Sequence, residues 1–271
     1  MALPGSITLL AVGGYGRGYL FPNSDIDLVV LLPVKGNKQN AMDAATKSKL
    51  ESWVRLLWDM GLEVGHSVRT LTECTEESEK DITVQTSLLE ARRLAGSSKL
   101  FSMFLQAIKS GLNPREFFNA KQFEQQQRHG RYHEVTNNLE PNLKESPGGL
   151  RDLQNILWVS RATGYGRSWS DLVRGGLITR EEARLTKHHE KILQGLRIRL
   201  HYLAERREDR LLFDFQALLA KEYKITDKPP RLAGELLMQR YYRAAKSVTQ
   251  INTILLLTLR CLLYTSDAAD E

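Results

Sequence analysis

Cysteine is scarce in this chain, which has only Cys74 and Cys261 among its 271 residues. Two cysteines cannot build a disulfide framework or a cysteine-based metal site, so a reducing compartment is expected and any metal would need oxygen ligands. No stretch approaches the roughly 18 uninterrupted apolar residues of a membrane span. The start, MALPGSITLLAVGG, lacks the basic segment and cleavage site of a signal peptide. These absences predict a cytoplasmic protein with no membrane partner.

Acidic residues are outnumbered, with 32 Asp and Glu against 38 Lys and Arg and a formal net charge of +6. This excess favours an anionic partner, but nucleotides, nucleic acid and an acidic protein would all satisfy it. No RNA-binding or DNA-binding signature is present, so a nucleic-acid partner is not expected. Charge alone therefore identifies no ligand.

The first 70 residues read as strand, loop, strand, helix, strand, which predicts an α/β unit with a small sheet. Apolar, β-branched runs mark the strands at 7–12, 25–32 and 62–69, and helical spacing of apolar residues marks a helix at 40–60. After Thr72 the pattern is nearly all helical, with one long loop rich in Asn, Pro and Gly at 136–149. Helices are expected at 81–94, 98–110, 114–132, 150–163, 180–207, 213–223 and from 231 onward. The sequence predicts an α/β domain over 1–110 and an all-α domain over 111–260.

The last eleven residues, 261–271, read CLLYTSDAADE. A DNA string that resembles a transposon-type sequencing adapter, read through in frame, can encode them. We therefore expect this segment to be a non-native tail, with the authentic sequence ending near Arg260.

Two carboxylates separated by one residue are the main candidate for chemistry. Asp25 and Asp27 lie on an expected strand, where alternate residues project from the same face. Like charges held this close repel each other unless a cation lies between them. Paired carboxylate oxygens are a usual way to hold Mg²⁺ that keeps water and phosphate ligands. Asp25 and Asp27 are thus the predicted metal ligands and catalytic residues.

A glycine-rich turn precedes the carboxylate pair, in the order Gly13-Gly14-Tyr15-Gly16-Arg17-Gly18. Glycine permits positive φ and lets backbone N–H groups approach a phosphate, and Arg17 can add a charge-assisted contact. Alone, this turn would more often be an ordinary surface turn. Combined with the carboxylates it predicts a nucleotide site, in which we place Gly13, Gly14, Arg17 and Ser24.

The stretch AVGGYGRGYLFPNSDIDLVVLL at 11–32 resembles the nucleotidyltransferase fold of the DNA polymerase beta superfamily. It is most similar to the PII uridylyltransferase family, and the block LEPNLKESPGGLRDLQ at 139–154 is similar to that family's signature after the catalytic domain. The resemblance implies a nucleotidyltransferase domain with a small mixed sheet, followed by a helical domain. It also implies Mg²⁺-dependent transfer of UMP from UTP to a tyrosine of the PII nitrogen-regulatory protein, with release of pyrophosphate.

The superfamily usually takes a third metal carboxylate from a later strand, and here its identity stays open. On the segment LEVGHSVR, Gly65 and His66 occupy the place where the related adenylyltransferase has an acid. Glu63, Asp81 and Glu90 are candidates, and none is marked by spacing. His66 itself is more often a structural histidine than a ligand.

Lys144 belongs to the second block, which reads as a glycine-terminated loop that leads into a helix. A helix N-terminus and a lysine both favour an anion, so Lys144 is placed with the nucleotide-binding residues. The alternative is a structural role, with Arg151 and Asp152 paired across the domain boundary.

Several features of the family are missing here. No His-Asp dipeptide is present, so the uridylyl-removing hydrolase and the glutamine-sensing domains are expected only in a longer parent, where glutamine would act as effector. Two alternatives stay open: an adenylyltransferase that acts on glutamine synthetase, and a degenerate nucleotide-binding regulatory module.

Overall fold

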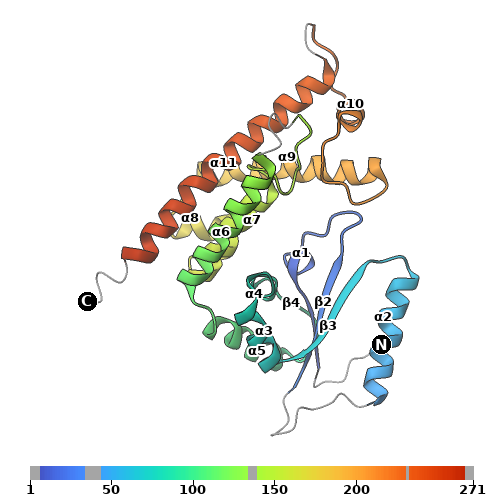
Figure 1. Ribbon diagram of the computed structural model, residues 1–271, viewed down its shortest axis with the longest axis vertical. Coiled ribbons are helices and arrows are strands. Elements are labelled where there is room, and N and C mark those ends of the chain that lie inside the picture. The colour runs from blue at the N-terminus through green and yellow to red at the C-terminus, as the bar shows by residue number, and fades with distance from the viewer. Residues whose placement is uncertain (1–6, 34–43, 134–138, 230–231, 266–271) are drawn as a thin grey trace. The chain divides into compact units, whose positions relative to one another are not determined.

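The computed structural model describes residues 7–33, 44–133, 139–229 and 232–265. The chain divides into two compact units, Met1–Leu112 and Asn113–Glu271. The first unit holds a four-stranded sheet with helices, and the second is helical (Figure 1). An α/β domain followed by a helical region is thus confirmed.

The first unit contains all four described strands, in the sheet order β3-β2-β1-β4. Strands β2 and β3 run parallel, whereas β1 pairs antiparallel with both β2 and β4, so the sheet is mixed as expected. The elements are β1 (Thr8–Ala11), α1 (Gly13–Gly16), β2 (Ile26–Leu32), α2 (Ala44–Asp59), β3 (Val64–Thr70), α3 (Leu71–Lys80), α4 (Ile82–Leu89), β4 (Arg92–Gly96) and α5 (Ser98–Ser110).

Helices cover the two faces of this sheet unequally. Helix α2 lies on one side of the sheet, and α3, α4 and α5 lie on the other (Figure 1). On the α2 side, Leu50 joins Leu9, Leu28 and Val64 in one buried cluster. Because side chains alternate along a strand, Asp27 faces the opposite side from Leu28, toward α1 and α4.

Strand β4 corrects the helix that the sequence predicted over 81–94. Helix α4 ends at Leu89, and Arg92–Gly96 pairs antiparallel with β1 as an edge strand. Gly96 has φ +90°, and a Cβ there would lie 2.0 Å from the Ile7 carbonyl oxygen, so only glycine fits this approach. The pairing partner is distant in sequence, which is why apolar spacing alone could not distinguish strand from helix.

The second unit is built from six described helices. They are α6 (Pro114–His133), α7 (Leu150–Ala162), α8 (Trp169–Arg174), α9 (Arg180–Ala204), α10 (Phe213–Glu222) and α11 (Ala233–Thr265). The short helix α8 and, in the first unit, α3 were not expected from the sequence. Helix α11 packs along α7, α9 and α10 and closes the core of this unit.

Helix α11 is, among the described residues, the one helix long and apolar enough to cross a membrane by length and composition. The core helix of a soluble protein passes the same test. Leu237, Val248 and Leu255 of α11 are buried. The helix continues through Cys261–Thr265, and the non-native origin predicted for 261–271 stays a prediction.

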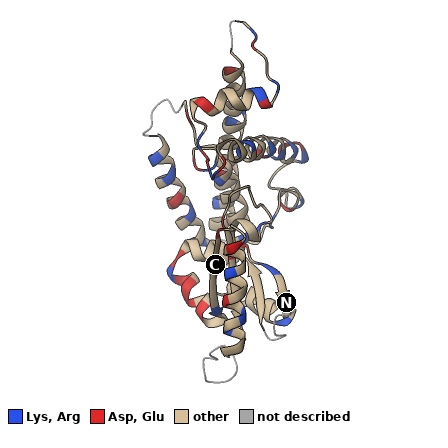
Figure 2. Ribbon diagram, turned by 90° about the vertical axis from the view of Figure 1, so that its right-hand side faces the viewer, with Lys and Arg blue, Asp and Glu red and all other residues tan. Residues whose placement is uncertain are grey.

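Basic residues do not collect in one block. Lys and Arg are spread over many helices (Figure 2). This distribution agrees with the expectation that charge alone does not define a binding surface.

We expect Gly16→Ala to destabilise the first unit, whereas Gly14→Ala serves as the matched control. A Cβ on Gly16 would lie 2.4 Å from the Glu90 carbonyl oxygen and 2.9 Å from that of Ala11. Overpacking against fixed backbone costs about 1–3 kcal/mol or more. A Cβ on Gly14 would meet its nearest atom at 3.5 Å, an ordinary contact. Urea unfolding of both variants measures the difference, and equal stabilities would contradict the close packing of α1 on the Glu90 main chain.

Candidate functional site

The glycine-rich turn forms the single-turn helix α1 directly after β1. Gly13 has φ +55°, a left-handed conformation that favours glycine. Within α1, the Gly16 amide donates to the Val12 carbonyl at 3.0 Å and the Arg17 amide to the Gly13 carbonyl at 3.1 Å. The amides of Gly13 and Gly14 precede these bonds and have no acceptor among the described residues, as is usual in the first turn of a helix.

Asp27 lies between two positions that have no side chain. A Cβ on Gly13 would come within 3.2 Å of one Asp27 carboxylate oxygen, and a Cβ on Gly65 within 3.0 Å of the other. Gly65 is also the residue of β3 that pairs with Asp27 in the parallel register. The Asp27 carboxylate therefore lies close to the main chain at both glycines, and neither position places a side chain beside it.

Asp25 lies immediately before β2 and is exposed, whereas Asp27 is half-buried. Burial raises the pKa of the Asp27 carboxyl, and the nearby charge of Asp25 raises it further. The structure thus brings the two predicted ligands together at the start of β2. A half-buried carboxylate beside a second carboxylate is a fit for a divalent cation, since both supply oxygen ligands and their negative charges lie close together.

None of the three candidates for a third carboxylate completes this pair. Glu63 is exposed before β3, and the Asp81 side chain caps α4 by accepting from the Thr83 amide at 2.6 Å. Glu90 is buried and forms an ion pair with Arg17. Over the described ranges, no group of three Asp, Glu, His or Cys residues could hold a metal.

Arg17 and Arg92 hold α1 in position. Arg17 forms an ion pair with Glu90 at the end of α4. A phosphate bound by Arg17 would therefore share the guanidinium group with the Glu90 carboxylate. Arg92 of β4 donates to the Tyr15 carbonyl at 3.0 Å and lies over the Tyr15 ring at 5.3 Å. Sequence reasoning missed Arg92 because β4 was predicted as part of a helix.

Ser24 ends the turn that leads into β2. Its amide donates to the Phe21 carbonyl at 3.2 Å, and Asn23 adopts a left-handed φ of 55°. Such a turn fixes the direction from which Asp25 enters the site.

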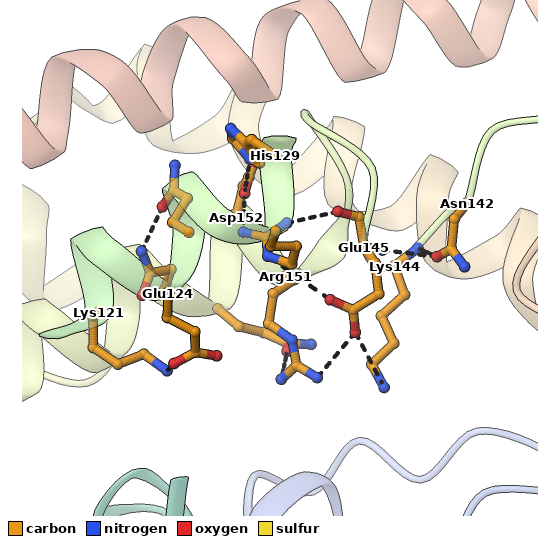
Figure 3. Close-up of polar contacts among 12 residues, drawn as sticks. Lys121, Glu124, His129, Asn142, Lys144, Glu145, Arg151 and Asp152 are labelled. Carbon is orange, nitrogen blue, oxygen red and sulfur yellow. Dashed lines mark hydrogen bonds and ion pairs between the residues drawn. The ribbon is translucent and has the colours of Figure 1, made fainter. Parts of the chain in front are cut away.

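Lys144 belongs to the helical unit, in the loop before α7. Figure 3 shows Lys121, Lys144 and Arg151 extending on the same side of α6 and α7. The Lys144 ammonium lies 3.5 Å from a Glu145 carboxylate oxygen, and Arg151 donates to that oxygen at 3.2 Å. Burial lowers the pKa of Lys144, and the charge of Arg151 lowers it further. Such crowding of cations favours an anion at this face, and in this structure the Glu145 carboxylate supplies it.

Asp152 anchors the loop that carries Lys144. It is fully buried and accepts hydrogen bonds from Arg128 at 2.5 Å, His129 at 2.9 Å and the Gly148 amide at 2.7 Å (Figure 3). Burial alone would raise the pKa of Asp152, but these donors outweigh it and the pKa lies below its usual range. Asp152 therefore finds its partners inside the helical unit, as Arg151 does with Glu145.

Two family models match the chain. A nucleotidyltransferase domain matches residues 3–88, and GlnD PII-uridylyltransferase matches residues 116–256. The first match, with the mixed sheet and the paired aspartates, defines the class: the chain contains a nucleotidyltransferase domain. The second match covers just over half of the chain. The chain belongs to the GlnD PII-uridylyltransferase family, as the sequence resemblance predicted.

Curated relatives of the chain are also named as uridylyltransferases. The chain is 64% identical over 269 residues to a bifunctional uridylyltransferase/uridylyl-removing enzyme of Nitrosospira multiformis, with 99% of this chain and 30% of the relative covered. It is 52% identical over 262 residues to the enzyme of that name from Chromobacterium violaceum, with 97% and 30% covered. The chain is 53% identical over 268 residues to the enzyme of that name from Bordetella avium, with 99% of this chain and 30% of the relative covered. The chain thus spans about 30% of the length of these curated relatives.

We expect Asp152→Asn to destabilise the helical unit by about 3 kcal/mol at pH 7, because breaking this buried ion pair leaves the Arg128 charge with only the more distant Glu145 carboxylate, at 3.8 Å. The lowered pKa means that this stabilisation is present above the unfolded pKa of about 3.9 and is lost as pH falls through the folded value. The difference between wild type and variant should therefore shrink in acid. Urea unfolding at pH 7 and pH 3.5 measures it.

Glu181→Gln is the control for this experiment. Glu181 pairs with Arg184 on the exposed face of α9, where an ion pair contributes little. An Asp152→Asn effect as small as that of the control would contradict the anchoring role.

Proposed function

We propose that this chain transfers UMP from UTP to a tyrosine of the bacterial PII protein and releases pyrophosphate, in the cytoplasm and with Mg²⁺. Family membership supports the reaction. One observation assigns the proposed reaction to particular residues: the Asp27 carboxylate lies between Gly13 and Gly65 and beside Asp25. Uridylyl removal and control by glutamine are assigned to a longer parent.

In this proposal Asp25 and Asp27 hold Mg²⁺ on the triphosphate. When bound, the metal would neutralise charge on the phosphates and on the leaving pyrophosphate. The amides of Gly13 and Gly14 would donate to phosphate oxygens, as the first-turn amides of helices commonly do. The turn that ends at Ser24 would hold Asp25 in reach of the same phosphates.

Arg17 and Lys144 are proposed as charge-assisted phosphate contacts. Arg17 would act while it remains paired with Glu90. Lys144 belongs to the helical unit, so its role requires that unit to reach the nucleotide.

A regulatory nucleotide-binding module is the second candidate, favoured by the absence of a three-carboxylate cluster over the described residues. Such a module would bind nucleotide and Mg²⁺ without turnover. Transfer of UMP to PII that Asp27→Asn abolishes would rule it out.

We expect UTP with Mg²⁺ to raise the melting temperature of this chain more than ATP, CTP or GTP does. Ligand at 100 times its Kd adds about 2.7 kcal/mol to the stability of the folded state. Differential scanning fluorimetry with and without Mg²⁺ measures the shift. An ATP preference would favour the adenylyltransferase alternative, and no shift from any nucleotide would contradict a working site.

Asp27→Asn should abolish this Mg²⁺-dependent shift and reduce UMP transfer by at least about 100-fold, as loss of a group that stabilises transition-state charge commonly does. The same variant should melt at a higher temperature without ligand. The raised pKa of Asp27 means that its ionised form costs stability as pH rises through the folded pKa, and Asn removes that charge.

The matched control for this variant is Asp59→Asn, at an exposed position at the end of α2. It removes the same charge from the same unit outside the site. An equal loss of transfer in both variants would contradict a specific role for Asp27.

Lys144→Ala should weaken UTP binding about tenfold, because a hydrogen bond to a charged group contributes about 1.5–3 kcal/mol. Calorimetric titration with UTP and Mg²⁺ measures the change. Lys191→Ala, at an exposed position on α9, is the control for the lost charge. Unchanged affinity in Lys144→Ala would assign Lys144 a structural role only.

A further inference from the structure

Strand β3 is an edge of the described sheet. The strand order β3-β2-β1-β4 leaves its outer side without a neighbouring strand over the residues that the structure describes. An edge strand presents a row of main-chain donors and acceptors that can pair with another extended segment. The question is which groups of β3 are available and what lies beside them.

The main-chain N–H and C=O groups of alternate β3 residues point away from β2, toward the outer edge of the sheet. The Ile26 amide of β2 donates to the Glu63 carbonyl at 2.8 Å, so Glu63, Gly65 and Ser67 face β2 in the parallel ladder. Val64, His66 and Val68 then face the outer edge. The Val64 carbonyl agrees with this assignment, since it accepts from the Trp58 indole N–H at 3.3 Å. The main-chain groups of His66 and Val68 are the open part of the edge.

Gly65 places no side chain between this edge of the sheet and the Asp27 carboxylate. It is exposed, it pairs with Asp27, and a Cβ at this position would contact the Asp27 carboxylate at 3.0 Å. Residues paired across neighbouring strands point to the same face of a sheet. A residue of an added strand opposite Gly65 would therefore point to the face that carries Asp27, with no side chain in between.

The spacing of strands limits which acceptor could use this path. An added strand would lie two strand spacings from β2, about 9–10 Å. A serine or threonine hydroxyl is too close to its own backbone to cross that distance. The phenol of a tyrosine extends much farther, so this edge fits an extended segment that presents a tyrosine.

Apolar side chains flank the same edge. Trp58 is 52% exposed and Val68 is 37% exposed. The Trp58 ring lies 5.9 Å from the ring of His66, on the side of β3 opposite Gly65. Residues next to the tyrosine in an added strand would point to that side, where Trp58 offers apolar contact.

We propose that β3 receives, as an additional strand, the segment of the PII protein that carries the acceptor tyrosine. This inference rests on the proposed function. The segment pairs with the main chain of His66 and Val68 and directs its tyrosine over Gly65 toward Asp27. Main-chain pairing supplies the affinity of this docking mode, and the exposed Trp58 contributes to its specificity.

Val68→Pro tests the pairing, with Val68→Ala as the matched control. Proline removes the outward N–H of Val68 but is tolerated on an edge strand, so the sheet should keep its stability. Alanine removes most of the same side chain and keeps the N–H. In steady-state transfer of UMP to PII, Val68→Pro should raise the KM for PII about tenfold, which corresponds to the upper end of the contribution of one hydrogen bond. The KM for UTP should stay at its wild-type value, and Val68→Ala should change the KM for PII much less.

Hydrogen exchange of the wild-type chain gives a second measurement that needs no turnover. Adding PII should slow exchange of the His66 and Val68 amides. Transfer to PII without this protection, or with a wild-type KM in folded Val68→Pro, would overturn the docking mode while the proposed function stands. Protection without transfer would support docking and count against the proposed reaction. Neither transfer nor protection would overturn both.

Discussion

The half-buried carboxylate of Asp27 is the constraint around which the first unit is arranged. Its oxygens face backbone at Gly13 and Gly65, and Asp25 adds a second negative charge nearby. Side chains at either glycine would close the space that a ligand needs. Gly13 brings the turn of α1 close to Asp27 of β2, and Gly16 lets the same turn pack directly on the Glu90 carbonyl. Arg17 and Arg92 then fix the turn from α4 and β4.

Two buried or half-buried aspartates in this chain differ in what surrounds them. Asp152 accepts hydrogen bonds from Arg128, His129 and a backbone amide, and its pKa is lowered. The Asp27 side chain has no donor among the described residues, and its pKa is raised. The carboxylate of Asp152 has its hydrogen-bond donors within the helical unit and organises a loop. The charge of the Asp27 carboxylate is compensated by no described donor, and a bound cation would therefore stabilise the folded state.

Local patterns were sufficient to predict three of the four strands and the helical character of the second unit, which follow from spacing of two and 3.6 residues. They also indicated that Asp25 and Asp27 project from one face of a strand, whereas the role of this pair as a site stays a prediction. Strand β4 could not be predicted this way, because its identity depends on pairing with β1, some eighty residues earlier in the chain. The same long-range pairing conceals the roles of Arg92 and Glu90. The Asp152 network was missed because its partners lie on α6, a separate helix.

The lack of a third carboxylate beside Asp25 and Asp27, over the residues that the structure describes, and the open edge of β3 concern one position. An acid at residue 65 would stand directly beside Asp27 in the β2–β3 register and could complete a cluster of three. It would also fill the space between the outer edge of the sheet and the proposed metal ligands, since even a Cβ there contacts Asp27. Position 65 can therefore hold a third ligand or leave a path for a long acceptor side chain, but not both. Glycine at this position favours the path, and with only two carboxylates the bound metal would depend more on oxygens from the substrate's phosphates.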